Sequence, residues 1–128
     1  MAFLMTPQFR IASCLVWCLC WPALAVLLLT PLPFGFISRT DLLAHFLVFG
    51  VMTAFLVLFV RSQTQLIVLA VLTMIYSLAL EVGQGYVPNR VFDVADAAAN
   101  LAGGVAGCLG ALFILRTYIR PAERRIPV

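Results

Sequence analysis

The chain has 128 residues, of which 64% are apolar and only 10% are charged, and its mean hydropathy is +1.11. A water-soluble domain of this length needs much more polar surface, so the composition excludes a soluble enzyme or regulator. We expect an integral membrane protein with a single domain over residues 1–128, because this length leaves no room for an additional soluble domain.

The charges are distributed unevenly along the chain. All eight positive charges are arginines, and the formal net charge is +3. Six arginines fall near the N-terminus, at residue 61 or near the C-terminus, whereas Arg39 and Arg90 occupy the other two connections. The positive-inside rule then predicts that both termini are cytoplasmic. The arginines from Arg116 onward suit anionic lipid headgroups better than nucleic acid, which we do not expect as a partner.

Four apolar segments predict four membrane-spanning helices, at about residues 11–30, 41–60, 65–84 and 92–118. The first segment follows Arg10 and ends at a proline-rich break. A signal peptide cleaved near Ala25 is the alternative for this segment, although its apolar run is longer than signal peptides usually have. The four segments together predict an all-α, integral membrane four-helix bundle with N-in, C-in topology.

Small residues recur in the fourth segment. Gly103 and Gly107 lie four residues apart, and Ala99 lies one turn before them. A strip of this kind lets two helices approach closely in a membrane. We predict that the strip packs inside the bundle, and a homodimer interface is the alternative.

The four cysteines lie in predicted spans and show no spacing typical of metal ligands. We interpret them as small packing residues, with Cys14 and Cys18 as an alternative thiol pair one turn apart. The sequence therefore assigns no cofactor and no metal site.

Polar residues interrupt the apolar segments at one end of the predicted bundle. With both termini inside, the start of the second span, the end of the third and the start of the fourth meet at the external face. Ionisable groups at membrane depth usually face the interior and mark functional sites, so we predict a ligand-binding pocket open to the outer leaflet. Its residues, at helical spacing, are Asp41 and His45 in the second span, Glu81 and Gln84 in the third, following Thr73 and Ser77, and Arg90, Asp93, Asp96 and Asn100 at the fourth.

Several of these residues also have a purely structural interpretation. Asp41 and Asp93 stand where a side chain can cap a helix. Arg90 is a natural ion-pair partner for the nearby acids, and an ordinary loop residue is its alternative.

His45, Glu81 and Asp96 lie at least one turn inside their helices, where capping does not explain them. The alternative for these three is an interhelical polar network that only fixes packing. Asn100 lies deeper still, and we interpret it as a packing clamp rather than a catalytic group.

These residues resemble those of the VanZ-like family of small bacterial membrane proteins. The resemblance rests on Asp41-x-x-x-His45-Phe46, Glu81-x-x-Gln84 and Pro88-x-Arg90-x-x-Asp93-x-x-Asp96-x-x-x-Asn100-x-x-Gly103-x-x-x-Gly107. It implies a multi-pass protein of the bacterial inner membrane. The founding member is associated with low-level resistance to the lipid-bearing glycopeptide teicoplanin, and no biochemical activity is attached to the fold. This chain departs from many relatives at Leu42, where they carry a lysine.

Three functions are compatible with the polar residues and the resemblance. The first is binding of an envelope lipid, precursor or lipopeptide headgroup, with lowered glycopeptide sensitivity as a consequence. The second is an accessory subunit of a larger membrane complex. The third is a membrane enzyme in which His45 or Glu81 acts as a base and carboxylates hold Mg²⁺ or Mn²⁺, although no familiar hydrolase motif is present. Membrane lipids are expected partners in all three.

Overall fold

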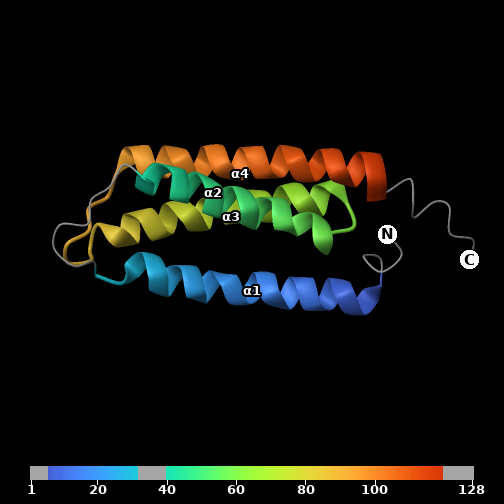
Figure 1. Ribbon diagram of the computed structural model, residues 1–128, viewed down its shortest axis with the longest axis horizontal. Coiled ribbons are helices and arrows are strands. Elements are labelled where there is room, and N and C mark those ends of the chain that lie inside the picture. The colour runs from blue at the N-terminus through green and yellow to red at the C-terminus, as the bar shows by residue number, and fades with distance from the viewer. Residues whose placement is uncertain (1–5, 32–39, 120–128) are drawn as a thin grey trace, which may run out of the picture.

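The computed structural model describes residues 6–31 and 40–119, without the side chains of residues 40, 41 and 119. A short 3₁₀ helix, η2 (Phe55–Leu58), extends the second helix, and a π-helical turn, η3 (Leu115–Ile119), extends the fourth. The described residues contain no strand, so the prediction of an all-α four-helix bundle is confirmed (Figure 1). The main helices are α1 (Pro7–Leu29), α2 (Thr40–Ala54), α3 (Gln63–Gln84) and α4 (Val94–Ile114).

Three of the described helices are long and apolar enough to cross a bilayer, namely α1, α3 and the continuous stretch Val94–Tyr118. The remaining apolar helix, Leu42–Leu58, lies within the second predicted span and is shorter than the other three. The 15 residues of α2 rise about 22 Å and the four residues of η2 add about 8 Å. Together they still match a hydrocarbon core of about 30 Å, because 3₁₀ winding is the more extended.

Capping residues explain where three of the helices begin. α1 begins before the predicted span because the Thr6 hydroxyl accepts a hydrogen bond from the backbone N of Phe9 at 3.3 Å. α3 begins at a capping box, in which the side chains of Ser62 and Gln65 each accept from the other's backbone N. α4 begins after the predicted position because Asp93 is its N-cap. In each case a side-chain oxygen binds a backbone N–H that the helix leaves without a partner.

The apolar core lies toward one end of the bundle, where α3 begins and α4 ends. Arg10, Arg61 and Arg116 belong to this end too, and Arg116 Nη2 donates to Gln63 Oε1 at 3.2 Å. The opposite end, where α2 and α4 begin and α3 ends, holds the polar residues and is called the polar end below. The buried core residues are Trp17, Met52, Leu56, Val57, Val60, Leu66, Ala70, Ala111 and Leu115.

α2 and α4 form the most extensive helix pair. A Cβ atom at Gly103 would overlap the carbonyl oxygen of Phe46, and a Cβ atom at Gly107 would overlap that of Gly50. Gly50 was not singled out from the sequence, yet a Cβ atom there would lie only 3.2 Å from the Gly103 carbonyl oxygen. The glycine strip of α4 therefore packs against α2 of the same chain.

α1 lies to one side of the other three helices (Figure 1), and only two of its residues are buried. The Trp17 indole Nε1 donates to the carbonyl oxygen of Met52 at 3.0 Å. Trp21 packs edge-on against Tyr76, with ring centres 4.5 Å apart. A few aromatic and polar contacts, rather than deep burial, thus attach α1 to its neighbours.

Candidate functional site

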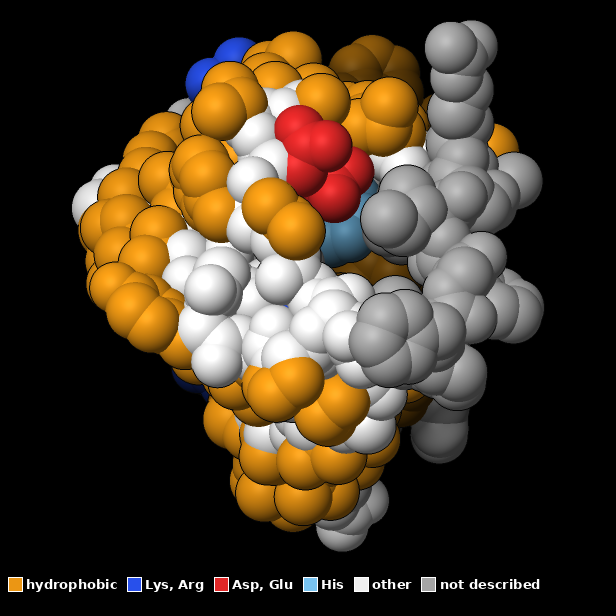
Figure 2. Space-filling view, turned by 90° about the vertical axis from the view of Figure 1, so that its left-hand side faces the viewer, with side chains coloured by type: hydrophobic (Ala, Val, Ile, Leu, Met, Phe, Trp, Pro, Cys, Tyr) orange, Lys and Arg blue, Asp and Glu red, His pale blue; other side chains and the backbone are white. Residues whose placement is uncertain are grey.

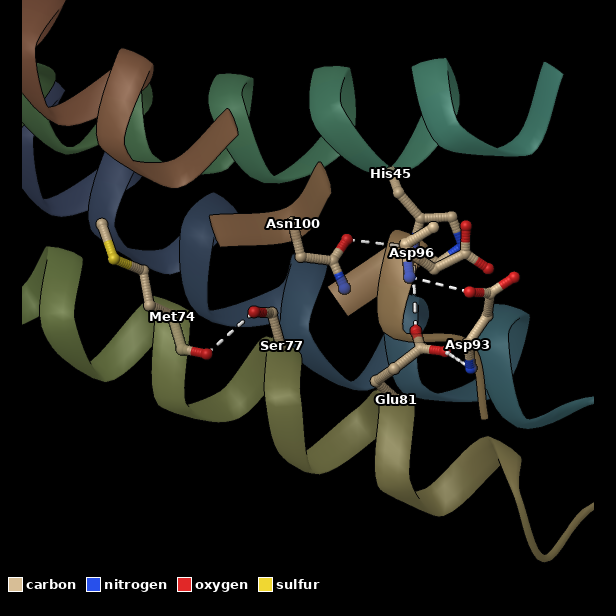
Figure 3. A network of polar contacts seen from close by, with 8 residues as sticks. His45, Met74, Ser77, Glu81, Asp93, Asp96 and Asn100 are labelled. Carbon is tan, nitrogen blue, oxygen red and sulfur yellow. Dashed lines mark hydrogen bonds and ion pairs between the residues drawn. The ribbon is translucent and has the colours of Figure 1, made fainter. Parts of the chain in front are cut away.

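Three helices bring one imidazole and two carboxylates together at the polar end (Figure 3). His45 of α2 lies 4.0 Å from Glu81 of α3, measured from Nδ1 to Oε2. It also lies 4.0 Å from Asp96 of α4, measured from Nε2 to Oδ2. One ligand atom from each side chain lies within 4.8 Å of the other two. The tight α2–α4 contact at Gly103 holds His45 and Asp96 on neighbouring helices.

The site reaches the surface through its α4 side. His45 and Glu81 expose only 4% and 1% of their surface, whereas the Asp96 side chain exposes 14%. Figure 2 shows acidic side chains at this end of the molecule, with histidine colour beside and beneath them. The buried part of the site is therefore close to the end of the bundle rather than in its centre.

Asn100 fixes the orientation of the histidine ring. Its Oδ1 lies 2.9 Å from His45 Nδ1, and both side chains are buried. An amide oxygen only accepts hydrogen bonds, so Nδ1 carries the proton and donates it. The other ring nitrogen, Nε2, consequently points toward Asp96.

Glu81 has two oxygens in different environments. Oε1 accepts a hydrogen bond from the backbone N of Asp93 at 3.1 Å, which ties the end of α3 to the start of α4. Oε2 is buried and accepts no hydrogen bond from any described residue, and the buried Nε2 of Gln84, one turn later, donates none. A buried polar atom without a partner costs about 1–3 kcal/mol, and more when it is charged. Two such atoms one turn apart indicate a place for a polar ligand or water.

Asp93 and Asp96 have different roles although both begin α4. Asp93 is exposed, and its Oδ1 accepts from the backbone N of Ala95 at 2.7 Å, as an N-cap does. Asp96 lies in the first helical turn, where the helix dipole favours a negative charge, and it turns toward His45. Asp41 is the second residue of α2, and its side chain lies outside the described part of the structure.

Thr73 and Ser77 continue the polar stripe of α3 toward the middle of the bundle. Both are fully buried. The Thr73 hydroxyl donates to the carbonyl oxygen of Leu69 at 2.8 Å, and the Ser77 hydroxyl donates to that of Met74 at 2.8 Å. Each hydroxyl is therefore satisfied within its own helix.

Arg90 pairs with none of the acidic side chains that the structure describes, and it binds α1 instead, which corrects the expectation of an ion pair. Its Nε donates to the carbonyl oxygen of Thr30 at 2.9 Å, and its Nη2 donates to that of Leu27 at 3.1 Å. These carbonyls belong to the last turn of α1, where acceptors are left over and the dipole favours a cation. A second arginine also binds a helix end: Arg10, near the start of α1, donates from Nη2 to the carbonyl oxygen of Phe59, just after η2, at 2.7 Å.

A tight turn sends Arg90 in this direction. The backbone N of Arg90 donates to the carbonyl oxygen of Val87 at 3.1 Å, and Pro88 and Asn89 lie between them. Asn89 has a φ of 63°, which asparagine tolerates better than most residues. Proline followed by a residue with positive φ is the arrangement of a type II turn.

Two features of the site were missed in the sequence analysis. The contact between Asn100 and His45 pairs residues 55 positions apart, and only the polarity of both residues hinted at it. The second feature is Gly50, which permits the close approach of α2 and α4. The sequence indicated it only as a single glycine within an apolar helix.

The described site residues can accept a cation or several hydrogen bonds. Glu81 and Asp96 offer carboxylate oxygens, and His45 offers an oriented ring nitrogen. Ammonium groups, hydroxyl groups and divalent metal ions all have the chemistry that such a set recognises.

Comparison with known families identifies the family of the chain. The family described as VanZ/LLP1 matches residues 26–116, well over half of the chain, and this range includes His45, Glu81, Asp96 and Asn100. No curated protein and no solved structure matches the chain. The polar end and the glycine strip both fall within the matched range, and the chain belongs to the VanZ/LLP1 family of membrane proteins.

Proposed function

We propose that the polar end binds the amine- or hydroxyl-bearing headgroup of an envelope lipid, lipid precursor or lipopeptide. The observation that supports this proposal is the buried Oε2 of Glu81, which accepts no hydrogen bond from the described residues and lies beside His45. An ammonium or hydroxyl donor from a ligand would satisfy this oxygen. Because Arg90 binds α1 instead, the proposed ligand group is a donor rather than an anion.

The apolar surroundings favour a ligand with acyl chains. A groove of about 450 Å³ lies between α1 and α2, and its lining is almost entirely apolar. An acyl chain would fit such a groove, since apolar surface in a membrane is covered by hydrocarbon. The groove is lined by Cys20, Ala23, Leu24, Leu27, Leu47, Val48, Val51 and Met52.

The distribution of arginines predicts on which side of the membrane the proposed binding takes place. With N-in, C-in topology, the polar end faces the outer leaflet of the bacterial inner membrane, where envelope precursors and lipopeptide antibiotics are exposed. Occupation of the site by such a ligand is the proposed route to lowered glycopeptide sensitivity.

Lipid binding by the purified protein in detergent tests the proposal. Phosphatidylethanolamine, phosphatidylcholine and phosphatidylglycerol with identical acyl chains differ only in the headgroup, and native mass spectrometry measures their binding. We expect phosphatidylethanolamine to bind best, because only its ammonium group donates N–H bonds to carboxylates. Glu81→Gln or Asp96→Asn should weaken its binding roughly 10- to 100-fold, as expected for the loss of a charge-assisted hydrogen bond.

Thr73→Val is the matched control, because this buried α3 hydroxyl bonds within its own helix. The same variants are compared for teicoplanin sensitivity in cells at equal protein abundance. Equal binding of the three lipids, or binding that Glu81→Gln and Asp96→Asn leave unchanged, would contradict the proposal.

A further inference from the structure

We propose that His45, Glu81 and Asp96 bind one hard divalent cation, Mg²⁺ or Mn²⁺, between α2, α3 and α4. The three side chains come from three helices, and one ligand atom of each lies within 4.8 Å of the other two. A cation about 2.1 Å from each ligand would draw these atoms to about 3 Å apart. Side-chain movements that bring these atoms closer together would therefore close the site.

The histidine is oriented as in known metal sites. Asn100 Oδ1 accepts the proton of Nδ1, with the two atoms 2.9 Å apart. Metal-binding histidines almost always donate their second ring N–H to an oxygen in this way, because the contact fixes the tautomer. Nε2 then presents its lone pair on the side where Asp96 Oδ2 lies, 4.0 Å away.

Glu81 supplies an independent indication that a ligand belongs here. Its Oε1 is held by the backbone N of Asp93, whereas Oε2 is buried and accepts no hydrogen bond from the described residues. A carboxylate oxygen at this depth in an apolar helix is costly without a donor or a cation. Oε2 lies beside the imidazole of His45, 4.0 Å from Nδ1.

The ligand set selects the class of metal. Two carboxylates and one imidazole suit a hard cation, which would complete its coordination with water or with oxygens of a bound molecule. The four cysteines would attract soft metals, but they lie on α1 and α4 away from this set. The inference does not depend on the proposed headgroup binding, since a cation can occupy these groups with or without a lipid.

Mn²⁺ binding to the purified full-length protein tests the inference. The chain contains one histidine, so an imidazole nitrogen coupling in the pulsed electron paramagnetic resonance spectrum of bound Mn²⁺ identifies His45 directly. The protein must carry a purification tag without histidine. We expect one saturable site per chain, the nitrogen coupling in the unaltered protein, and its loss in His45→Gln.

Affinity measurements on folded variants complete the test. Glu81→Gln and Asp96→Asn should each weaken Mn²⁺ binding at least about 10-fold, and Asn100→Leu should weaken it about 10- to 100-fold, because it removes the oxygen that orients the ring. Thr73→Val should leave it unchanged. The absence of saturable binding, or binding without nitrogen coupling, overturns the inference without requiring any variant to fold.

The two proposals fail separately. Mn²⁺ binding without a preference for phosphatidylethanolamine or phosphatidylglycerol over phosphatidylcholine overturns only the proposed function. Lipid binding that depends on Glu81, in a protein that binds no Mn²⁺, overturns only the cation site. If both are correct, the lipid ammonium group and Mn²⁺ compete for the same carboxylates, and added phosphatidylethanolamine raises the apparent Kd for Mn²⁺.

Discussion

Asn100 and His45 form a buried pair whose two members depend on each other. The Nδ1 proton of His45 is donated to Asn100 Oδ1 across 2.9 Å, and the two residues expose only 4% and 1% of their surface. Removing one partner leaves the other with a buried polar group, whereas replacing both with apolar residues removes the hydrogen-bonding requirement of this contact.

A double-mutant cycle on this pair should therefore be strongly non-additive. Asn100→Leu should destabilise the protein by about 1–3 kcal/mol, because it leaves the Nδ1 proton without an acceptor. The double variant His45→Leu, Asn100→Leu should be more stable than the sum of the two single losses predicts. Unfolding in mixed detergent measures all four proteins, and additive losses would show that the pair contributes no coupling.

Arg90 shows which part of the site the sequence could not predict. Helical spacing identifies His45, Glu81 and Asp96 as candidates for one end of the bundle, because 3.6 residues per turn fixes where polar residues point. The direction of Arg90 depends instead on how the turn at Asn89 and the end of α1 lie relative to each other, which the sequence pattern does not show. Long, flexible side chains near helix ends can reach several partners, so their contacts require the structure.

The α2–α4 pair is the element on which the geometry of the site depends. A Cβ atom at Gly103 meets backbone, which cannot move aside, whereas one at Gly104 meets the flexible side chain of Met74. Gly110 faces open space, with nothing within 4 Å of an added Cβ atom. The space available for an added Cβ atom therefore increases from Gly103 to Gly104 to Gly110 along one helix.

Alanine substitutions along this series should have graded effects on stability. Gly103→Ala should cost about 1–3 kcal/mol or more, because it forces α2 and α4 apart. Gly104→Ala should cost less, and Gly110→Ala should be neutral or slightly stabilising, because alanine is the better helix former by about 1 kcal/mol. Thermal unfolding in detergent gives the order. A loss at Gly110→Ala equal to that at Gly103→Ala would contradict close packing of α2 and α4 within one chain.

The helices themselves were easier to predict than their ends. Apolar runs and capping residues such as Ser62 indicate where the helices lie and start. The change from α-helical to 3₁₀ winding at Phe55 could not be predicted, because the 3₁₀ segment contains no proline or glycine. Leu56 and Val57 are buried in the apolar core there, so packing against other helices accompanies the change in winding.

At the scale of the whole molecule, the bundle has a packed apolar end and a polar end. The core residues gather where Arg10, Arg61 and Arg116 lie. At the other end lie Glu81 Oε2 and Gln84 Nε2, the buried side-chain atoms that have no hydrogen-bond partner among the described residues. The apolar core and the candidate site are thus separated along the long axis of the bundle. A substitution at Glu81 or Asp96 should therefore alter the proposed binding while the apolar core, at the far end, remains intact.

The same asymmetry predicts how the protein lies in the membrane. Arg10, Arg61 and Arg116 share one end of the structure, and the positive-inside rule puts that end in the cytoplasm. In a variant without native cysteines, Tyr86→Cys at the polar end should react with a membrane-impermeant maleimide on intact spheroplasts. Thr64→Cys, at the start of α3, should react only after lysis. Both side chains are exposed, so accessibility from water on each side decides the result.

The reverse labelling pattern would place His45, Glu81 and Asp96 at the cytoplasmic leaflet. The cation site could then still form, because it depends on the distances among three helices and not on orientation. Binding of an extracellular lipopeptide at this site would be excluded, because it requires access from outside. Labelling of both cysteines on intact spheroplasts would indicate two orientations in one membrane. The arginine distribution, with six on one side against Arg39 and Arg90 on the other, should prevent this.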